Sequence, residues 1–154
     1  MKKFSTSKGF TLIELLVVIT IITALGVAVF VALNPAQRLA DARNARRTTD
    51  VDTILSAIHQ YIVDEGSAPT GLSTTEKQLG TAATGCAIAT GGCAVAGAAD
   101  CLDITAPLAS YLKSIPADPN GTASLTGYSA VQDANGIVTI KACAAESTTI
   151  SASR

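Results

Sequence analysis

The chain is poor in the residues that most catalytic sites use. Its 154 residues include one histidine, no tryptophan, three tyrosines and three phenylalanines, and charged residues make up 15% of the total. One histidine leaves little material for acid–base catalysis, and no catalytic triad, phosphate-binding loop or dinucleotide-binding fingerprint appears in the sequence. We therefore expect that the protein is not an enzyme. The small number of aromatic residues predicts a small, aliphatic hydrophobic core.

One long stretch almost lacks charge. Between Phe10 and Leu33 the only charged residue is Glu14. A helix over this stretch would be about 36 Å long, enough to cross a hydrocarbon core of about 30 Å. Because three lysines precede it, the positive-inside rule predicts a single-pass helix in the cytoplasmic membrane, with everything after Leu33 outside. A carboxylate inside an apolar helix is costly, which makes Glu14 a candidate functional residue.

The start of the stretch has a defined order of residue types. A basic residue, a small residue, an aromatic residue and an acid stand in the sequence Lys8-Gly9-Phe10-Thr11-Leu12-Ile13-Glu14. This order resembles the class III signal of type IV pilins and of the pseudopilins of type II secretion. The resemblance implies that a prepilin peptidase cuts between Gly9 and Phe10 and methylates the new Phe10 amine. It also implies that Glu14 faces the N-terminal amine of a neighbouring subunit during filament assembly.

The resemblance implies a structural subunit that forms a helical homopolymer, with an inner-membrane assembly platform and an assembly ATPase as partners. The protein would lie first in the membrane and then in an extracellular or periplasmic filament. The alternatives are a secretion pseudopilin and a minor pilin for DNA uptake or adhesion. An ordinary secretory signal fits less well, because the run is long, contains an acid and has no A-x-A site. The alternative for Glu14 is a carboxylate that snorkels to the head groups or is protonated.

An amphipathic continuation of the helix is predicted after Pro35. Apolar residues recur at helical spacing at Val51, Ile54, Leu55, Ile58 and Ile62, which is typical of a helix packed on a core. Gly66 is expected to end this helix as a left-handed cap. Gly26 and Pro35 are the predicted positions of a helix break outside lipid, Pro35 because it lacks a backbone donor. A smooth kink is the alternative for the isolated subunit.

A cluster of basic residues in this helix has two interpretations. It consists of Arg43, Arg46 and Arg47. Contact with DNA or phospholipid head groups is one interpretation. Ion pairing with Asp41, Asp50 and Asp52 is the preferred one. Without the leader lysines, eight basic residues remain against twelve acidic ones, so nucleic-acid binding is not expected.

The four cysteines all follow the apolar stretch, in the exported part, where oxidation is permitted. The Ala-, Gly- and Thr-rich segment 81–97 can bury little apolar surface, so we expect disulfide bonds to hold it in place. Four cysteines allow three connectivities, of which we predict Cys86–Cys93 and Cys101–Cys143. Zinc is not expected, because the intervals between these cysteines are too wide.

The C-terminal part contains a hairpin signal. Strands over 128–132 and 137–143 flank an Asn-Gly turn, and Val138, Ile140 and Ala142 share the face expected to pack on the helix. Residues 146–154 are predicted to form a polar tail. Two short helices are predicted earlier, capped by Ser73 and Thr105.

A turn-rich string precedes the hairpin. Pro116-Ala117-Asp118-Pro119-Asn120-Gly121, with Tyr128 following, resembles the head of pilins and major pseudopilins. In many major pseudopilins nearby oxygens hold calcium, and a Trp stands where this chain has Asn120. Asp118 and Asp133 are the candidate calcium ligands here, although the turn alone explains the residues adequately. No other cofactor or metal is expected.

These features predict an α+β, pilin-like lollipop. One long N-terminal helix packs its C-terminal half on a small head with a short antiparallel sheet. The predicted segments are a leader at 1–9, a transmembrane or filament-core helix at 10–33, an amphipathic continuation at 34–65, and a disulfide-tied head at 66–154.

Overall fold

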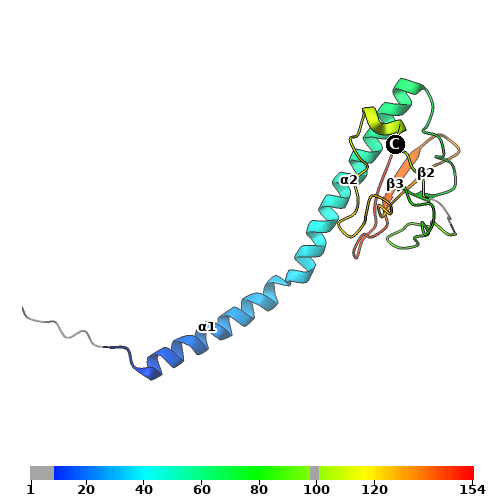
Figure 1. Ribbon diagram of the computed structural model, residues 1–154. Helices are drawn as coiled ribbons and strands as arrows, with labels where there is room; N and C mark the ends of the chain where they lie inside the picture. Colours follow the sequence, from blue (N-terminus) through cyan, green and yellow to red (C-terminus); the bar gives the residue numbers. More distant parts are fainter. Residues whose placement is uncertain (1–8, 98–100) are drawn as a thin grey trace, which may run out of the picture. The chain divides into compact units, whose positions relative to one another are not determined.

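The computed structural model describes residues 9–97 and 101–154 (Figure 1). Residues 1–8 of the predicted leader lie outside this part. The chain divides into two units, one up to Leu39 and one over Ala40–Arg154. The predicted α+β class is confirmed, because two helices are followed by a four-stranded antiparallel sheet.

Helix α1 (Leu12–Leu33) dominates the first unit. Its 22 residues correspond to about 33 Å. None of its residues is buried. In the part of the chain described here, one helix is long and apolar enough to cross a membrane, and its apolar portion lies near the N-terminus. Many of its residues are β-branched and poor helix formers in water, but only a helix satisfies the backbone of a single segment in lipid.

A single residue interrupts the helix. Asn34 adopts a left-handed conformation with φ of 39°, and α2 (Pro35–Glu65) begins directly after it. Pro35 lacks an N–H and so suits the first position of a helix. The break predicted at Gly26 is absent, since Gly26 lies inside α1. A glycine weakens a helix by only about 1 kcal/mol, too little to end one of this length.

The second unit joins α2, from Ala40 onward, to a small sheet with the strand order β1-β2-β3-β4. Each strand is antiparallel to its neighbours. The strands are β1 (Lys77–Gln78), β2 (Tyr128–Gln132), β3 (Val138–Ala142) and β4 (Ile150–Ser153). A 3-10 turn, η1 (Pro107–Ser110), lies between β1 and β2 in the sequence.

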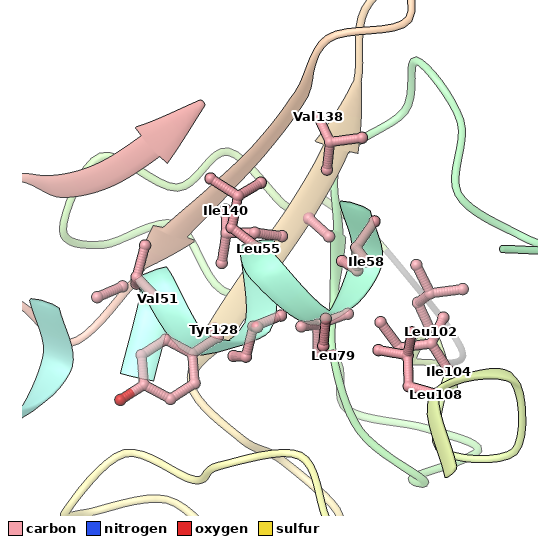
Figure 2. Packing of buried hydrophobic residues seen from close by; sticks show 14 residues of the cluster. Val51, Leu55, Ile58, Leu79, Leu102, Ile104, Leu108, Tyr128, Val138 and Ile140 are labelled. Atoms are coloured by element: carbon pink, nitrogen blue, oxygen red, sulfur yellow. The ribbon is translucent and has the colours of Figure 1, made fainter. Parts of the chain in front are cut away.

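The core lies between α2 and the sheet (Figure 2). The predicted helical stripe is confirmed, with Val51, Ile54, Leu55 and Ile58 buried and Ile62 partly buried. The predicted inner face of β3 is confirmed too, because alternate residues Val138, Ile140 and Ala142 are fully buried. α2 ends as expected at Gly66, which has a φ of 71° and bonds back to the Ile62 carbonyl oxygen.

Three local predictions were wrong. Ser73 caps no helix, because β1 pairs with β2 and draws Glu76 to the hydroxyl of Ser129 and the ammonium of Lys141. Thr105 does not cap η1, whose N-cap is Ala106 without a side-chain hydrogen bond. The predicted polar tail contains β4, which pairs along β3. In each case, pairing or packing with distant residues overrides the local preference.

The predicted disulfide pairing was also wrong. The structure joins Cys86 to Cys101 and Cys93 to Cys143, with Cα–Cα distances of 5.2 and 5.3 Å. The predicted pairs Cys86–Cys93 and Cys101–Cys143 are not formed, and no described cysteine is free. Both bridges therefore tie the 81–97 segment to other parts of the head.

The fold of that segment explains the observed pairing. Ile88 and Val95 form an antiparallel bridge, so the chain turns back on itself between them. In that turn, the Thr90 hydroxyl donates to the carbonyl oxygen of Cys143 at 2.6 Å, which brings the turn to the end of β3. The amide of Cys101 donates to the Ala82 carbonyl oxygen, which places Cys101 near the other end of the segment.

Candidate functional site

The predicted cleavage point lies in exposed, non-helical chain. Gly9 and Phe10 are both exposed and precede α1, and the Phe10 side chain is 87% exposed. A protease binds its substrate in an extended form, and this peptide bond needs no helix to unwind before it is reached. The local structure is therefore compatible with cleavage between Gly9 and Phe10.

Thr11 and Glu14 form a reciprocal cap at the start of α1. The Glu14 amide donates to Thr11 Oγ1 at 3.3 Å. In return, the Thr11 amide and the Thr11 hydroxyl both donate to Glu14 Oε2, each at 2.8 Å. This capping box satisfies amides that have no partner inside the helix. Sequence reasoning singled out Glu14 but missed Thr11, although a Thr followed three residues later by Glu is the known sequence signal.

The rest of α1 presents a continuous apolar surface. Its large apolar side chains are between 46% and 81% exposed. Such a surface exceeds by far what soluble proteins leave in water, so lipid or other protein must cover it. Glu14 is the only charged residue along it.

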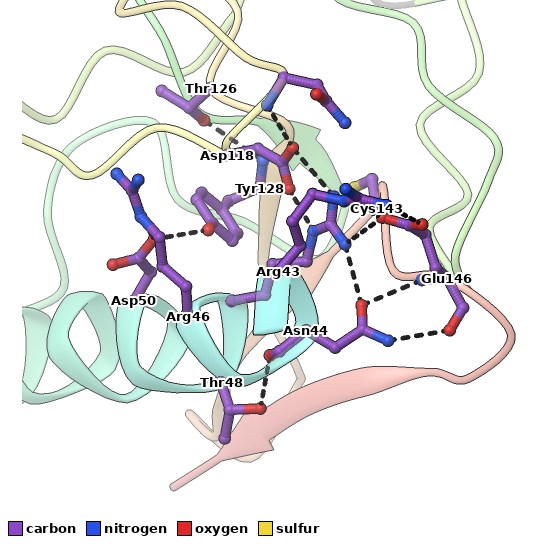
Figure 3. Close-up of polar contacts among 12 residues, drawn as sticks. Arg43, Asn44, Arg46, Thr48, Asp50, Asp118, Thr126, Tyr128, Cys143 and Glu146 are labelled. Carbon is purple, nitrogen blue, oxygen red and sulfur yellow. Dashed lines mark hydrogen bonds and ion pairs between the residues drawn. The ribbon is translucent and has the colours of Figure 1, made fainter. Parts of the chain in front are cut away.

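In the head, Arg47 and Asp118 form a buried ion pair. Figure 3 shows Asp118 with neighbouring polar residues, among them Arg43, Asn44 and Glu146. Arg47 Nε donates to Asp118 Oδ2 at 2.5 Å, and Nη2 donates to Oδ1 at 3.2 Å. Their side chains are 0% and 1% exposed. The hydrogen bonds that Arg47 donates to Asp118 raise the pKa of Arg47. This pair fastens the loop before β2 to α2.

Glu146 is held by the same face of α2. Arg43 donates to both of its carboxylate oxygens at 2.6 Å, and Arg47 adds a bond of 3.0 Å. Asn44 bonds to the backbone amide and carbonyl of Glu146. The bonds from Arg43, followed by those from Arg47, lower the pKa of Glu146 to about 2. The loop between β3 and β4 is thereby clamped to the helix.

Ion pairing accounts for the whole arginine cluster. Arg46 Nε lies 3.6 Å from Asp50 Oδ2, and the same oxygen accepts a hydrogen bond of 2.8 Å from the Tyr128 hydroxyl. Burial and this bond raise the pKa of Tyr128. Of the predicted pairs, the one between Arg46 and Asp50 is confirmed. Arg43 and Arg47 pair instead with Glu146 and Asp118, which lie far away in the sequence rather than on the helix.

The two candidate calcium ligands already have protein partners. Asp118 is bound by Arg47 and also accepts the Asn120 amide at 2.9 Å. Asp133 accepts the amides of Ile137 and Asn135 at 2.8 Å each, which lowers its pKa. Within residues 9–97 and 101–154, no group of three or more His, Cys, Asp or Glu residues is placed to hold a metal. Calcium binding stays a prediction, and an ion at Asp118 would have to displace Arg47.

A groove of about 420 Å³ runs beside α2 in the head. It is lined by hydroxyl, amide and carboxylate groups, among them Asp52, Ser56, Gln60 and Tyr111. The Tyr111 hydroxyl donates to Asp64 at 2.7 Å, and this bond raises the pKa of Tyr111 to about 12. The Tyr111 hydroxyl therefore links the chain at the end of η1 to the end of α2.

The comparisons with known proteins agree with the geometry of the N-terminal segment. The exposed chain at Gly9 and Phe10, the capped acid and the exposed apolar helix are compatible with a membrane-anchored precursor. Residues 4–30 match the family model described as the prokaryotic N-terminal methylation motif. The chain thus carries the class III signal of type IV pilins and pseudopilins, which indicates processing by prepilin peptidase and a structural subunit of filaments. No curated protein and no solved structure matches the chain.

Proposed function

We propose that this protein is a type IV pilin-like subunit that polymerises into a helical surface filament. The observation that carries the proposal is α1, a wholly exposed apolar helix that contains one acid and overlaps the match to the N-terminal methylation motif. Such a helix is stable in the bilayer and, equally, in a bundle of copies of itself. Head-to-tail packing of identical subunits builds an open helical polymer.

Glu14 and the Phe10 amine supply the axial register. Cleavage after Gly9 creates an amine four residues before Glu14. In a low-dielectric bundle an uncompensated carboxylate is strongly unfavourable, and a neighbour's amine neutralises it. Pairing across the interface therefore favours one axial offset between subunits over others. The resemblance implies the same contact.

The head fits the role of an outer sheath. It is tied by two disulfides, and its cluster of arginines is neutralised by the head's own carboxylates. A head whose charged groups are paired with one another needs no ligand to be stable. The assembly platform and the assembly ATPase in the membrane are the proposed partners during polymerisation.

Glu14→Gln tests the proposal, because it removes the charge and keeps the size of the side chain. We expect the variant to be inserted in the membrane and processed, but to be absent from filaments in sheared surface fractions viewed by electron microscopy. Glu65→Gln, the same change at an exposed position of α2, is the matched control and is expected to form normal filaments.

Normal filaments from Glu14→Gln would refute the role of Glu14 in setting the axial register, and the absence of the wild-type chain from every filament fraction would refute the proposed function. The gene neighbourhood and a secretion assay separate the alternative roles. A wild-type strain without surface filaments whose protein export depends on this chain would identify a secretion pseudopilin. Filaments in which another protein forms the bulk would identify a minor pilin.

A further inference from the structure

The two oxygens of the Glu14 carboxylate differ in their contacts. Oε2 accepts both the amide and the hydroxyl proton of Thr11, each at 2.8 Å. Oε1 has no hydrogen-bond partner among the residues that the structure describes. The other hydroxyls of α1 are turned elsewhere, since Thr20 and Thr23 donate to carbonyl oxygens of their own helix.

We propose that Thr11 is a positioning residue for subunit assembly, which holds Oε2 so that Oε1 is presented to the amine of a neighbouring subunit. This inference rests on the proposed function, because it assigns a second residue to the Glu14 contact. The carboxylate is shared between two chains, with one oxygen bound by its own Thr11 and the other by the neighbour's Phe10 amine.

The physical reason lies in the surroundings of Glu14. An ionised carboxylate in hydrocarbon loses the hydrogen bonds of water, and each protein donor offsets part of that loss. Thr11 supplies two donors from one residue. The N-terminus of α1 also carries the positive end of the helix dipole, which favours a negative charge at this position.

The Thr11 hydroxyl also fixes where the carboxylate points. A free Glu side chain samples several rotamers, and fixing it in one of them on assembly costs conformational entropy. A side chain that is already fixed before assembly avoids this cost. Side chains on a helix lean toward its N-terminus, and the bonds to Thr11 hold Glu14 in that direction, toward Phe10. The subunit is thus preorganised for its neighbour while it is still in the membrane.

Thr11→Val and Thr11→Ser test the inference in the full-length chain. Valine keeps the shape but removes the hydroxyl, whereas serine keeps the hydroxyl. Each tagged variant is co-expressed with the wild type, and its fraction in sheared filaments is divided by its fraction in the processed membrane pool. Loss of an N-cap side chain predicts about a fivefold lower ratio for Thr11→Val. Thr11→Ser is expected to stay within about twofold of the wild type, since substitution between these two capping residues changes little.

Three outcomes would overturn the inference. They are an unchanged ratio for Thr11→Val, an equal loss for Thr11→Ser, and a block of cleavage in Thr11→Val, which would assign Thr11 to the peptidase instead. Glu14→Gln in the same assay separates the two proposals. If it is excluded from filaments while Thr11→Val enters normally, only the role of Thr11 is wrong. If Glu14→Gln enters normally, the Glu14 contact is wrong as well, and absence of the wild-type chain from the filaments would refute the proposed function itself.

Discussion

The buried pair of Arg47 and Asp118 gives the sharpest prediction for the head. Asp118→Asn leaves the Arg47 guanidinium fully buried, with Glu146 at 3.0 Å as its remaining carboxylate partner. Removing one partner of a buried ion pair usually destabilises by about 3–5 kcal/mol. Because Glu146 still compensates part of the charge, we expect a value near the lower end, about 3 kcal/mol. Typical domains are stable by only about 5–15 kcal/mol, so the change is large.

Urea unfolding of the detergent-solubilised chain measures this effect. The three tyrosines, Tyr61, Tyr111 and Tyr128, all lie in the second unit, so the tyrosine band of the near-ultraviolet circular dichroism spectrum follows the unfolding of that unit. With a urea dependence of about 2 kcal/mol per M, a loss of 3 kcal/mol lowers the midpoint by about 1.5 M.

Two further variants make the result decisive. Asp41→Asn, the same change at an exposed position of α2, is expected to alter stability by less than about 0.5 kcal/mol. Replacing Arg47 and Asp118 together by Met and Leu is expected to cost less than Asp118→Asn alone, because no buried charge remains unpaired. A loss below about 1 kcal/mol for Asp118→Asn, or a double variant that is the least stable of all, would refute the reasoning.

Two other predictions concern the clamp and the disulfides. Because the folded-state pKa of Glu146 is about 2 and its ordinary value is 4.5, the stability that its ion pairs contribute is present above pH 4.5 and is lost as the pH falls toward 2. Glu146→Gln should therefore flatten the fall of the urea midpoint between pH 5 and 2.5, and an unchanged acid profile would count against the clamp. Removing the Cys93–Cys143 bridge, which spans 50 residues, should cost about 4 kcal/mol, against about 3 kcal/mol for the bridge that spans 15. Peptide mapping under non-reducing conditions checks the pairing, and an equal or reversed order of the two losses would contradict the loop-entropy reasoning.

The predictable parts of this fold are those that local sequence encodes. The spacing of Val51, Ile54, Leu55 and Ile58 marks the buried stripe of α2 because a helix repeats every 3.6 residues. The alternation in β3 and the Asn-Gly turn mark the hairpin in the same way. The N-terminal signal is readable because its residue types must occur in a fixed order over a few positions.

The parts that escaped prediction depend on contacts between distant residues. Arg47 and Asp118 are 71 positions apart, so no spacing rule pairs them. Glu76 shows the same limit, since its position after Ser73 suggests a capping box, yet β1 forms and the carboxylate binds Lys141. The cysteine pairing follows from the turn of segment 81–97 against β3, a contact that cysteine spacing alone does not reveal.

The N-terminal residue of the protein recovered from sheared surface filaments tests the central claim most directly. Intact mass and N-terminal sequencing are expected to show a chain that begins at Phe10 with a methylated amine and that forms the bulk of the filament. A mature protein that still begins at Met1, or one that is released as a free monomer without residues 10–33, would contradict the account.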